Sequence, residues 1–267
     1  MKLQYCSDLH LEFRENKEFM KSNPLQVKGD ILLLAGDIIP FAIMDKHKDF
    51  FDFVSDNFQY TYWMPGNHEY YYSDAALRSG ALNEKIRDNV FLVNNVSIEH
   101  SKVKLIFSTL WSKISVAHER QIEQSMSDFQ VIKFNGYRFS SVAYNHLHQD
   151  CINFIRQSVS ENTSCKNVVV THHAPTFMHY PEQYKGDVLN EAFAVELFDF
   201  IESSDISHWI YGHHHTNTPD FRIGNTLLVT NQLGYVKYGE HKLFLSDEII
   251  TLDENDNITI SKRIFAQ

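Results

Sequence analysis

Short apolar runs of strand length recur along the chain and predict the elements of a layered α/β fold. Their length, and the polar or turn residues around them, are typical of β-strands rather than of long buried helices. One of them, Ile31–Ala35, contains no polar residue, which favours a strand that is buried on both faces. The predicted strands are Leu3–Cys6, Ile31–Ala35, Tyr60–Met64, Lys104–Phe107, Val168–Val170, Trp209–Tyr211 and Thr226–Val229.

Several segments between these strands carry the spacing of amphipathic helices. Apolar residues from Phe50 to Phe58 recur close to every third or fourth position, which predicts one helix. Residues 74–87 predict a second helix with Ser73 as its N-cap, and residues 192–201 predict a third. Because strands alternate with helices, we expect parallel pairing at the centre of the fold.

Other predicted strands follow one another with no helix between them. Val90–Val93 and Val96–Ile98 flank the pair Asn94-Asn95, which predicts a tight hairpin. Near the C-terminus, Glu248–Leu252 and Ile258–Ile264 flank a run of Asp, Glu and Asn, which predicts another hairpin. The sheet structure should therefore be mixed, with antiparallel strands added to a parallel core.

The organisation of the chain points to a single domain over residues 1–267. It contains no long Pro, Gly or Ser linker, internal repeat or low-complexity tract. Residues 111–165 carry few strand patterns and predict a mostly helical insertion that caps the site. With 43% hydrophobic and 22% charged residues, the 267-residue chain can bury a substantial core and is not predicted to be disordered.

Charge and cysteine content limit the classes of function. The formal net charge of −10, without a dense run of Lys or Arg, argues against broad nucleic-acid binding, because such binding depends on cations that neutralise phosphates. Three scattered cysteines are too few for a disulfide framework or a thiolate metal site. No apolar stretch approaches the roughly 20 residues that span a bilayer. The N-terminus leads directly into a strand, so we expect no signal peptide and a cytoplasmic location.

Clusters of residues with oxygen or imidazole donors follow several predicted strands. Taken alone, each cluster has an ordinary explanation, such as a turn aspartate or a polar loop. Together, in one order and each at a strand end, they predict that the strand ends meet at one rim and bind metal there. The clusters are Asp8-Leu9-His10, Gly36-Asp37, Gly66-Asn67-His68-Glu69, His172-His173 and Gly212-His213-His214-His215.

Local geometry predicts the donors in the clusters that contain spaced pairs. Asp8 and His10 lie two residues apart, so an extended backbone directs both side chains to the same side. The same spacing relates His213 to His215. Asp8 and His10 therefore offer a carboxylate and an imidazole to one ion, and His214 should point away from the side that His213 and His215 share.

The remaining clusters are expected to offer one donor each. A carboxylate directly after the buried strand that ends at Ala35 is costly unless a cation compensates it, which makes Asp37 a candidate ligand. Asn67 offers a neutral oxygen where a further carboxylate would cancel too much positive charge. Adjacent side chains of a strand diverge, so only one of His172 and His173 should be a ligand.

The order of these clusters resembles that of the calcineurin-like metallophosphoesterase superfamily. That pattern is Asp-x-His, Gly-Asp, Gly-Asn-His-Asp/Glu, His and Gly-His-x-His, and the resemblance covers residues 3 to about 240. One departure is Pro40, where the family often has a second Asp that is not a metal ligand. The resemblance implies a four-layer αββα sandwich of two mixed β-sheets flanked by helices.

The resemblance also implies a pair of metal ions and a reaction. Donors of this kind suit Mn, Fe or Zn without choosing among them. The implied activity is hydrolysis of a small phosphomonoester or phosphodiester by a metal-bridging hydroxide, with His68 assisting the leaving group and Asp37 orienting His68. One ion would be held by Asp8, His10, Asp37 and His215, and the other by Asp37, Asn67, His172 and His213, with Asp37 bridging.

Substrate contacts and alternative functions are less constrained by the sequence. Tyr70, Arg138, His173 and Tyr184 lie near the clusters or in segments expected to cover them, although such side chains are more often part of a core. A DNA nuclease of the same fold is one alternative, which the acidic charge disfavours. A non-catalytic protein-binding scaffold is another, which the complete ligand set disfavours. The pattern leaves the oligomeric state open.

Overall fold

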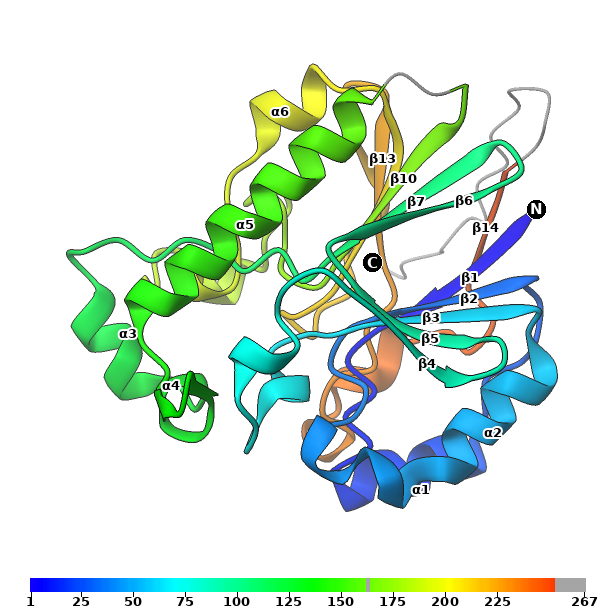
Figure 1. The fold of residues 1–267 in the computed structure, drawn as a ribbon, viewed down its shortest axis with the longest axis horizontal. Coiled ribbons are helices and arrows are strands. Elements are labelled where there is room, and N and C mark those ends of the chain that lie inside the picture. The colour runs from blue at the N-terminus through cyan, green and yellow to red at the C-terminus, as the bar shows by residue number, and fades with distance from the viewer. Residues whose placement is uncertain (162–163, 253–267) are drawn as a thin grey trace.

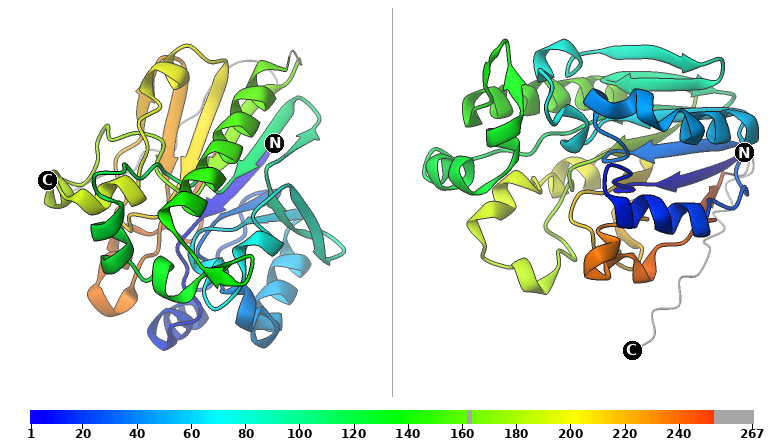
Figure 2. Two further views of the ribbon diagram at one scale, coloured as in Figure 1. Left: turned by 60° about the vertical axis from the view of Figure 1, so that its left-hand side comes forward. Right: turned by 90° about the horizontal axis from the view of Figure 1, so that it is seen from below.

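Two β-sheets stack face to face, and helices cover the outer face of each (Figures 1 and 2). The computed structural model describes residues 1–161 and 164–252. Each sheet has six strands, with parallel strands at its centre and antiparallel strands at both edges. This arrangement confirms the predicted αββα sandwich of two mixed sheets.

The first sheet is built largely from the N-terminal third of the chain. Its four inner strands are parallel, and its two edge strands run antiparallel to them. In spatial order the strands are β14 (Ile249–Thr251), β1 (Lys2–Cys6), β2 (Ile31–Ala35), β3 (Tyr60–Met64), β5 (Val90–Asn94) and β4 (Leu82–Arg87).

The second sheet repeats this plan with strands from the rest of the chain. Its inner strands are again parallel and its edges antiparallel. In spatial order the strands are β12 (Phe221–Ile223), β13 (Thr226–Thr230), β11 (Ile206–Tyr211), β10 (Lys166–Thr171), β7 (Val103–Ser108) and β6 (Val96–His100).

Helices form the outer layers and part of the rim where the parallel strands end. α1 (Arg14–Ser22) and α2 (Lys48–Asn57) cover the first sheet, and α5 (Ser141–Ser160) and α6 (Phe198–Glu202) cover the second (Figure 1). At the rim lie α3 (Glu119–Ser125), α4 (Asp128–Val131) and the small hairpin β8 (Lys133–Phe134) and β9 (Tyr137–Arg138). Among the described residues, no helix has the combined length and apolar character that a membrane crossing requires.

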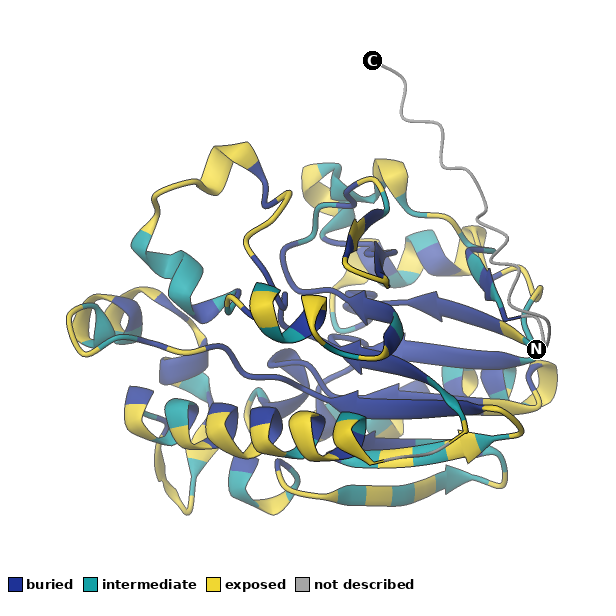
Figure 3. Ribbon diagram, turned by 90° about the horizontal axis from the view of Figure 1, so that it is seen from above, coloured by how far each residue is buried: buried dark blue, intermediate teal, exposed yellow. Residues whose placement is uncertain are grey.

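Alternation along the central strands divides the apolar core into layers. Leu33 of β2 faces the other sheet and packs in one cluster with Phe107 and Val170. Its neighbour Leu34 points outward, into a cluster with Phe51 of α2. Figure 3 shows the consequence: the central strands are buried, whereas the helices carry buried and exposed stripes. Burying each such side chain stabilises the fold by about 1.5–3 kcal/mol.

The predicted helix over residues 74–87 is wrong. The chain forms only a short 3₁₀ turn at Ala75–Leu77 and then the edge strand β4. Residues of β4 pair antiparallel with β5, for example Glu84 with Leu92, and this pairing overrides the weak helical spacing. The predicted helix over residues 192–201 is also largely wrong, because only Phe198–Glu202 is α-helical.

The predicted hairpin around Asn94-Asn95 is wrong as well, because β5 and β6 belong to different sheets. The chain crosses between the sheets at Asn95, whose φ is 46°. Asn94 holds this crossing: its carbonyl oxygen accepts the N–H of Thr109 and its amide donates to the carbonyl of Ser79. In the predicted C-terminal hairpin, the first strand is β14, which pairs with β1, and residues 258–264 lie outside the described residues.

Residues 111–165 contribute both to an outer layer of the sandwich and to its rim. α5 is one layer of the sandwich, because its buried residues Ile152 and Ile155 pack with Ile106 of β7. α3 and α4 instead lie at the rim, beside the strand ends (Figure 2). That this rim portion acts as a cap stays a prediction.

Candidate metal centre

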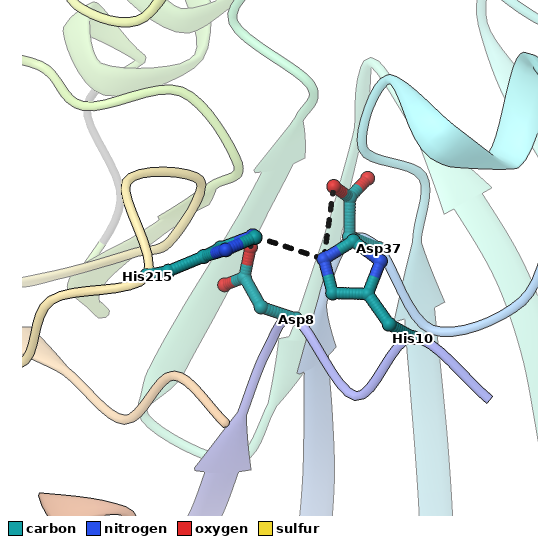
Figure 4. Close-up of side chains that lie close together, drawn as sticks. All are labelled: Asp8, His10, Asp37 and His215. Carbon is teal, nitrogen blue, oxygen red and sulfur yellow. Dashed lines mark hydrogen bonds and ion pairs between the residues drawn. The ribbon is translucent and has the colours of Figure 1, made fainter. Parts of the chain in front are cut away.

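The carboxyl ends of β1, β2, β3, β10 and β11 bring all the predicted ligands to one end of the sandwich. They form two clusters that share Asp37. In the first, drawn in Figure 4, one donor atom from each of Asp8, His10, Asp37 and His215 lies within 4.8 Å of the others. His10 Nε2 is 2.9 Å from His215 Nε2 and 3.7 Å from Asp37 Oδ2. His215 Nε2 is 3.4 Å from Asp8 Oδ1.

The second cluster lies deeper and centres on His172. Its Nε2 atom is 3.4 Å from Asp37 Oδ2 and 3.1 Å from His213 Nδ1. The neutral carboxamide of Asn67 completes the group, with Oδ1 3.2 Å from the same nitrogen. Of the two adjacent histidines, His172 is therefore the one in a cluster. His173 is turned away, and its Nδ1 bonds a main-chain carbonyl that follows β7.

These spacings fit metal binding. Donor atoms held about 2.0–2.2 Å from one ion lie about 3–3.6 Å from each other. The distances of 2.9–3.7 Å within the two clusters lie within about 0.1 Å of that range. In the first cluster, the two imidazole nitrogens of His10 and His215 face each other at 2.9 Å, and their lone pairs would repel unless a proton or a cation lay between them. The donors are imidazole, carboxylate and amide oxygen, a set that suits first-row transition metals.

Carboxylates fix the histidines of the first cluster. His10 Nδ1 lies 3.1 Å from Glu12 Oε1, and His215 Nδ1 lies 2.9 Å from Glu240 Oε2. An ionised carboxylate only accepts hydrogen bonds, so each Nδ1 carries the proton and each Nε2 directs its lone pair into the cluster. This is the arrangement by which partners of metal-binding histidines set tautomer and ring orientation.

In the second cluster, main-chain carbonyls fix the tautomer and ring orientation of the histidines. His172 Nδ1 donates to the carbonyl of Ala35 at 2.9 Å, which frees Nε2. His213 Nε2 donates to the carbonyl of Ala192 at 3.3 Å, which frees Nδ1. Each histidine in the two clusters thus offers one nitrogen to the centre.

Charged neighbours within the clusters shift the pKa values of Asp37 and His172. Burial raises the pKa of the Asp37 carboxyl, but the neighbouring His172, His68 and His10 imidazoles hold that pKa well below its usual range. Burial lowers the pKa of His172, and Asp37 and Asp8 outweigh this and raise it to about 9. A cation that binds here replaces the imidazole protons, since a histidine ligates metal in its neutral form.

Five of the seven candidate ligands stand on left-handed rather than extended backbone. φ is 56° at Asp8, 46° at His10, 56° at Asp37, 81° at His213 and 52° at His215. The prediction that Asp8 and His10 converge through an extended backbone is therefore wrong, and so is the same prediction for His213 and His215. The side chains converge because each backbone turns sharply after its strand. Such conformations cost about 1–3 kcal/mol each for a non-glycine residue, and they concentrate at functional sites.

Two motif glycines make room for the ligands. A Cβ atom on Gly66 would lie 2.2 Å from Asp37 Oδ1 and 2.6 Å from His172 Nε2. A Cβ atom on Gly212 would lie 2.6 Å from Asp8 Oδ2. Any side chain at either position would displace a candidate ligand.

Glu69 ties the loops after β2 and β3 together, a role that the sequence did not indicate. Its buried carboxylate accepts the main-chain N–H groups of Asp37, Ile38 and Gly66 and the indole N–H of Trp63, at 2.7–3.0 Å. Burial, together with the charge of Asp37, raises the pKa of Glu69 to about 7. The only signal in the sequence was its place in the Gly-Asn-His-Glu motif.

His68 stands beside the first cluster without belonging to the predicted ligand set. Its main-chain N–H donates to Asp37 Oδ1 at 2.9 Å, and its ring Nδ1 lies 2.9 Å from Glu12 Oε1. Asp37 therefore holds the main chain of His68, whereas Glu12 orients the ring, which differs from the predicted role of Asp37. Burial lowers the pKa of His68, but Asp37 and Glu12 outweigh it, so the net shift is upward. The ring stacks on Tyr71, with 4.0 Å between centroids.

Asp128 of α4 orients the amide of the candidate ligand Asn67, a role that the sequence did not indicate. Its Oδ1 atom accepts from Asn67 Nδ2 at 3.0 Å and from the Tyr71 hydroxyl at 2.8 Å. Because the carboxylate binds the NH₂ group, the carbonyl oxygen of Asn67 faces His172. An aspartate 61 residues away along the chain gives no local pattern that would indicate this role.

A cavity of about 370 Å³ opens beside both clusters. Of the four predicted substrate contacts, the structure places Tyr184 on its wall. Tyr70 is instead buried in the core and donates to the carbonyl of Arg78. Arg138 donates to a main-chain carbonyl of α4, and His173 is buried behind His213.

Comparison with known proteins identifies the family. Residues 1–217 match the family model of the calcineurin-like phosphoesterases. The uncharacterised protein L509 of Acanthamoeba polyphaga mimivirus is 32% identical over 260 residues, which cover 87% of this chain and 91% of that protein. Phosphopantetheinyl hydrolase from Mycobacterium tuberculosis has a similar fold, with a TM-score of 0.69 and 14% identity over 96% of this chain and 98% of that one. The chain belongs to the calcineurin-like phosphoesterases and is a metal-dependent phosphoric ester hydrolase.

Proposed function

We propose that this hydrolase cleaves a small phosphoester with a pair of metal ions held side by side at the two clusters. The observation that carries the proposal is the position of Asp37. One oxygen of this carboxylate, Oδ2, lies 3.7 Å from His10 Nε2 and 3.4 Å from His172 Nε2, so it reaches the donors of both clusters. A shared carboxylate is what holds two ions close enough to act on one phosphoryl group.

The donor set fits manganese, iron or zinc. When bound, such ions polarise phosphoryl oxygens and lower the pKa of water. The first ion would be held by Asp8, His10, Asp37 and His215, and the second by Asp37, Asn67, His172 and His213.

The chain itself supplies the proton for the leaving group. Glu12 occupies Nδ1 of His68, so Nε2 is the ring nitrogen that can serve a substrate. The Tyr235 hydroxyl lies 3.5 Å from this nitrogen, and both residues line the cavity. The carboxylates of Asp37 and Glu12 raise the pKa of His68, which favours the protonated ring that an acid catalyst needs. In this role, Nε2 donates its proton to the departing oxygen, while Tyr71 packs against the ring and keeps it in place.

Substitution of His68 tests this function. His68→Ala should retain both ions and lose about 10²-fold or more in turnover, the usual range for loss of an acid catalyst. His146→Ala is the control, because that imidazole is 68% exposed and belongs neither to a cluster nor to the cavity lining. Turnover would be measured with p-nitrophenyl phosphate and bis-p-nitrophenyl phosphate after reconstitution with each metal, with metal content determined by elemental analysis. Near-normal turnover in His68→Ala removes this residue from the mechanism, and absence of hydrolysis by the wild type with every metal overturns the function.

A further inference from the structure

The cavity beside the two clusters has aromatic walls and, among the described residues that line it, no Lys or Arg. Tyr71, Tyr180, Tyr184 and Tyr235 contribute rings, and Leu189 contributes an apolar side chain. The volume of about 370 Å³ falls within the roughly 300–1,000 Å³ typical of sites for organic ligands. It therefore has room for an organic group next to the phosphoryl group, and faces on which that group can stack.

Carboxylates crowd the same end of the molecule. Those that lie in the clusters or bond the side chain of a cluster residue are Asp8, Glu12, Asp37, Asp128 and Glu240. Two divalent ions would bring about +4 and a protonated His68 about +1, so these five acids leave no excess positive charge when the candidate ligand histidines are neutral. A dianionic phosphomonoester is harder to accommodate here than a monoanionic phosphodiester, because enzymes that bind highly charged phosphates commonly add Arg or Lys.

We propose that the substrate is a phosphodiester with an uncharged or cationic organic arm that occupies this cavity. The proposal rests on the proposed hydrolase function and narrows its substrate class. An arm with further phosphates, as in a nucleic acid, would meet acidic and aromatic walls without a compensating cation.

A substrate comparison tests the proposal. We expect kcat/KM to be at least about 10-fold higher for bis-p-nitrophenyl phosphate than for p-nitrophenyl phosphate, each normalised to its uncatalysed rate, and no hydrolysis of single-stranded DNA. A preference for the monoester, or cleavage of DNA, overturns the substrate class while leaving the hydrolase intact. Hydrolysis of none of the three overturns the hydrolase function instead.

A lysine introduced into the cavity wall should shift the preference between diester and monoester. Leu189→Lys should raise kcat/KM for the monoester relative to the diester by about 3- to 10-fold, because it adds the missing charge. Leu77→Lys is the matched control, since Leu77 is 82% exposed and does not line the cavity. If Leu189→Lys fails to fold, Tyr184→Lys places the charge on a residue that is already 38% exposed. An unchanged ratio in a folded variant contradicts the proposed role of the wall.

One oxygen of the Glu12 carboxylate accepts hydrogen bonds from the rings of both His10 and His68. Oε1 lies 3.1 Å from His10 Nδ1 and 2.9 Å from His68 Nδ1, and the two rings meet edge to face at 4.5 Å. The other oxygen is buried and has no hydrogen-bond partner among the residues that the structure describes. The carboxylate is therefore held mainly by a ligand of the first cluster on one side and by the proposed acid on the other.

From this geometry we infer that Glu12 is a positioning residue that fixes His68 relative to the first cluster. It acts through His68 and does not touch the substrate. The inference also rests on the proposed function, because it assigns a partner to the proposed acid.

A double-mutant cycle tests this role. At saturating manganese, Glu12→Ala should lower kcat by about 10- to 100-fold with KM changed less than about 3-fold, the scale seen for partners that orient site histidines. In a His68→Ala background the same change should cost less than about 2-fold, because the ring to be positioned is gone. Glu12→Gln, which can still accept both hydrogen bonds, should recover part of the loss.

One outcome of the double-mutant cycle would contradict the proposed role of Glu12. If the effects of Glu12→Ala and His68→Ala multiply, Glu12 does not act through His68 and the inference is wrong. Glu15→Ala, an exposed glutamate on α1, is the matched control and should behave as the wild type. A wild-type protein without activity would instead contradict the proposed function.

Discussion

The two ligand clusters share Asp37 but orient their histidines by different means. In the first cluster, the carboxylates of Glu12 and Glu240 accept the imidazole N–H groups. In the second, main-chain carbonyls at the end of β2 and at Ala192 accept them. The second cluster is also more deeply buried: His172 has no exposed side-chain surface, whereas 14% of the His215 side chain is exposed.

This difference separates what side chains control from what the fold controls. A carboxylate partner makes an imidazole more basic and adds negative charge to the site, and a single substitution removes it. A carbonyl partner adds no net charge and persists whatever side chain its residue carries. The first cluster should therefore be tunable by substitution of its partners, whereas the second should respond only to changes in ligands or backbone.

The largest effect is expected where the two clusters meet. Asp37→Ala removes the shared carboxylate, so both ions should be lost and turnover should fall by about 10³-fold or more. Metal content by elemental analysis and kcat/KM for bis-p-nitrophenyl phosphate would report this, with Asp88→Ala, whose side chain is 99% exposed, as the control. A variant that keeps one tightly bound ion and near-normal turnover would show that Asp37 does not serve both clusters.

A substitution in the backbone that supports the second cluster should have the next largest effect. Gly66→Ala places a Cβ atom 2.2 Å from Asp37 Oδ1, which should cost about 1–3 kcal/mol of unfolding free energy and displace the ligands. At Gly80, apart from the glycine and its two chain neighbours, no atom of the described chain lies within 4 Å of an added Cβ atom, so Gly80→Ala should change stability by less than about 0.5 kcal/mol. Urea unfolding of both variants measures the contrast. Equal stability of the two would contradict the close approach at Gly66.

The smallest expected effect tests the difference between the clusters directly. Glu240→Ala removes the partner of His215, so the affinity of one ion should fall by about 10- to 100-fold while the other is retained. Ala192→Gly is the counterpart in the second cluster, and because the carbonyl remains, neither affinity should change by more than about 2-fold. Chelator competition titrations resolve the two ions. Equal weakening of both ions by Glu240→Ala would remove the distinction between the clusters.

Strands, and the order of the ligand clusters, could be predicted from the sequence because both are local. β2 and β3 have the predicted bounds, since the apolar run of β2 and the aromatic-rich run of β3 leave little alternative to a strand. The segment 74–87 could not be predicted in this way, because its strand exists only through pairing with β5. The crossing at Asn95 could not be predicted either, since a tight hairpin and a change of sheet begin with the same turn residues.

In the candidate site too, residues in local motifs could be predicted from the sequence, whereas residues that the fold brings together could not. Asp8, His10 and the other ligands stand in short motifs at strand ends, so the sequence indicates them. Glu12, Asp128 and Glu240 are ordinary acidic residues in the sequence, and they gain their roles only when the fold brings each within hydrogen-bonding distance of a site residue. How the ligands converge was also hidden, because left-handed backbone at non-glycine residues has no reliable sequence pattern.

Anomalous diffraction from crystals loaded with manganese tests the two-ion centre most directly. The expected result is two peaks about 3.5–4 Å apart, with Asp37 between them, His10 and His215 on one ion, and His172 and His213 on the other. A single peak, or peaks that Asp37 does not contact, would contradict the account.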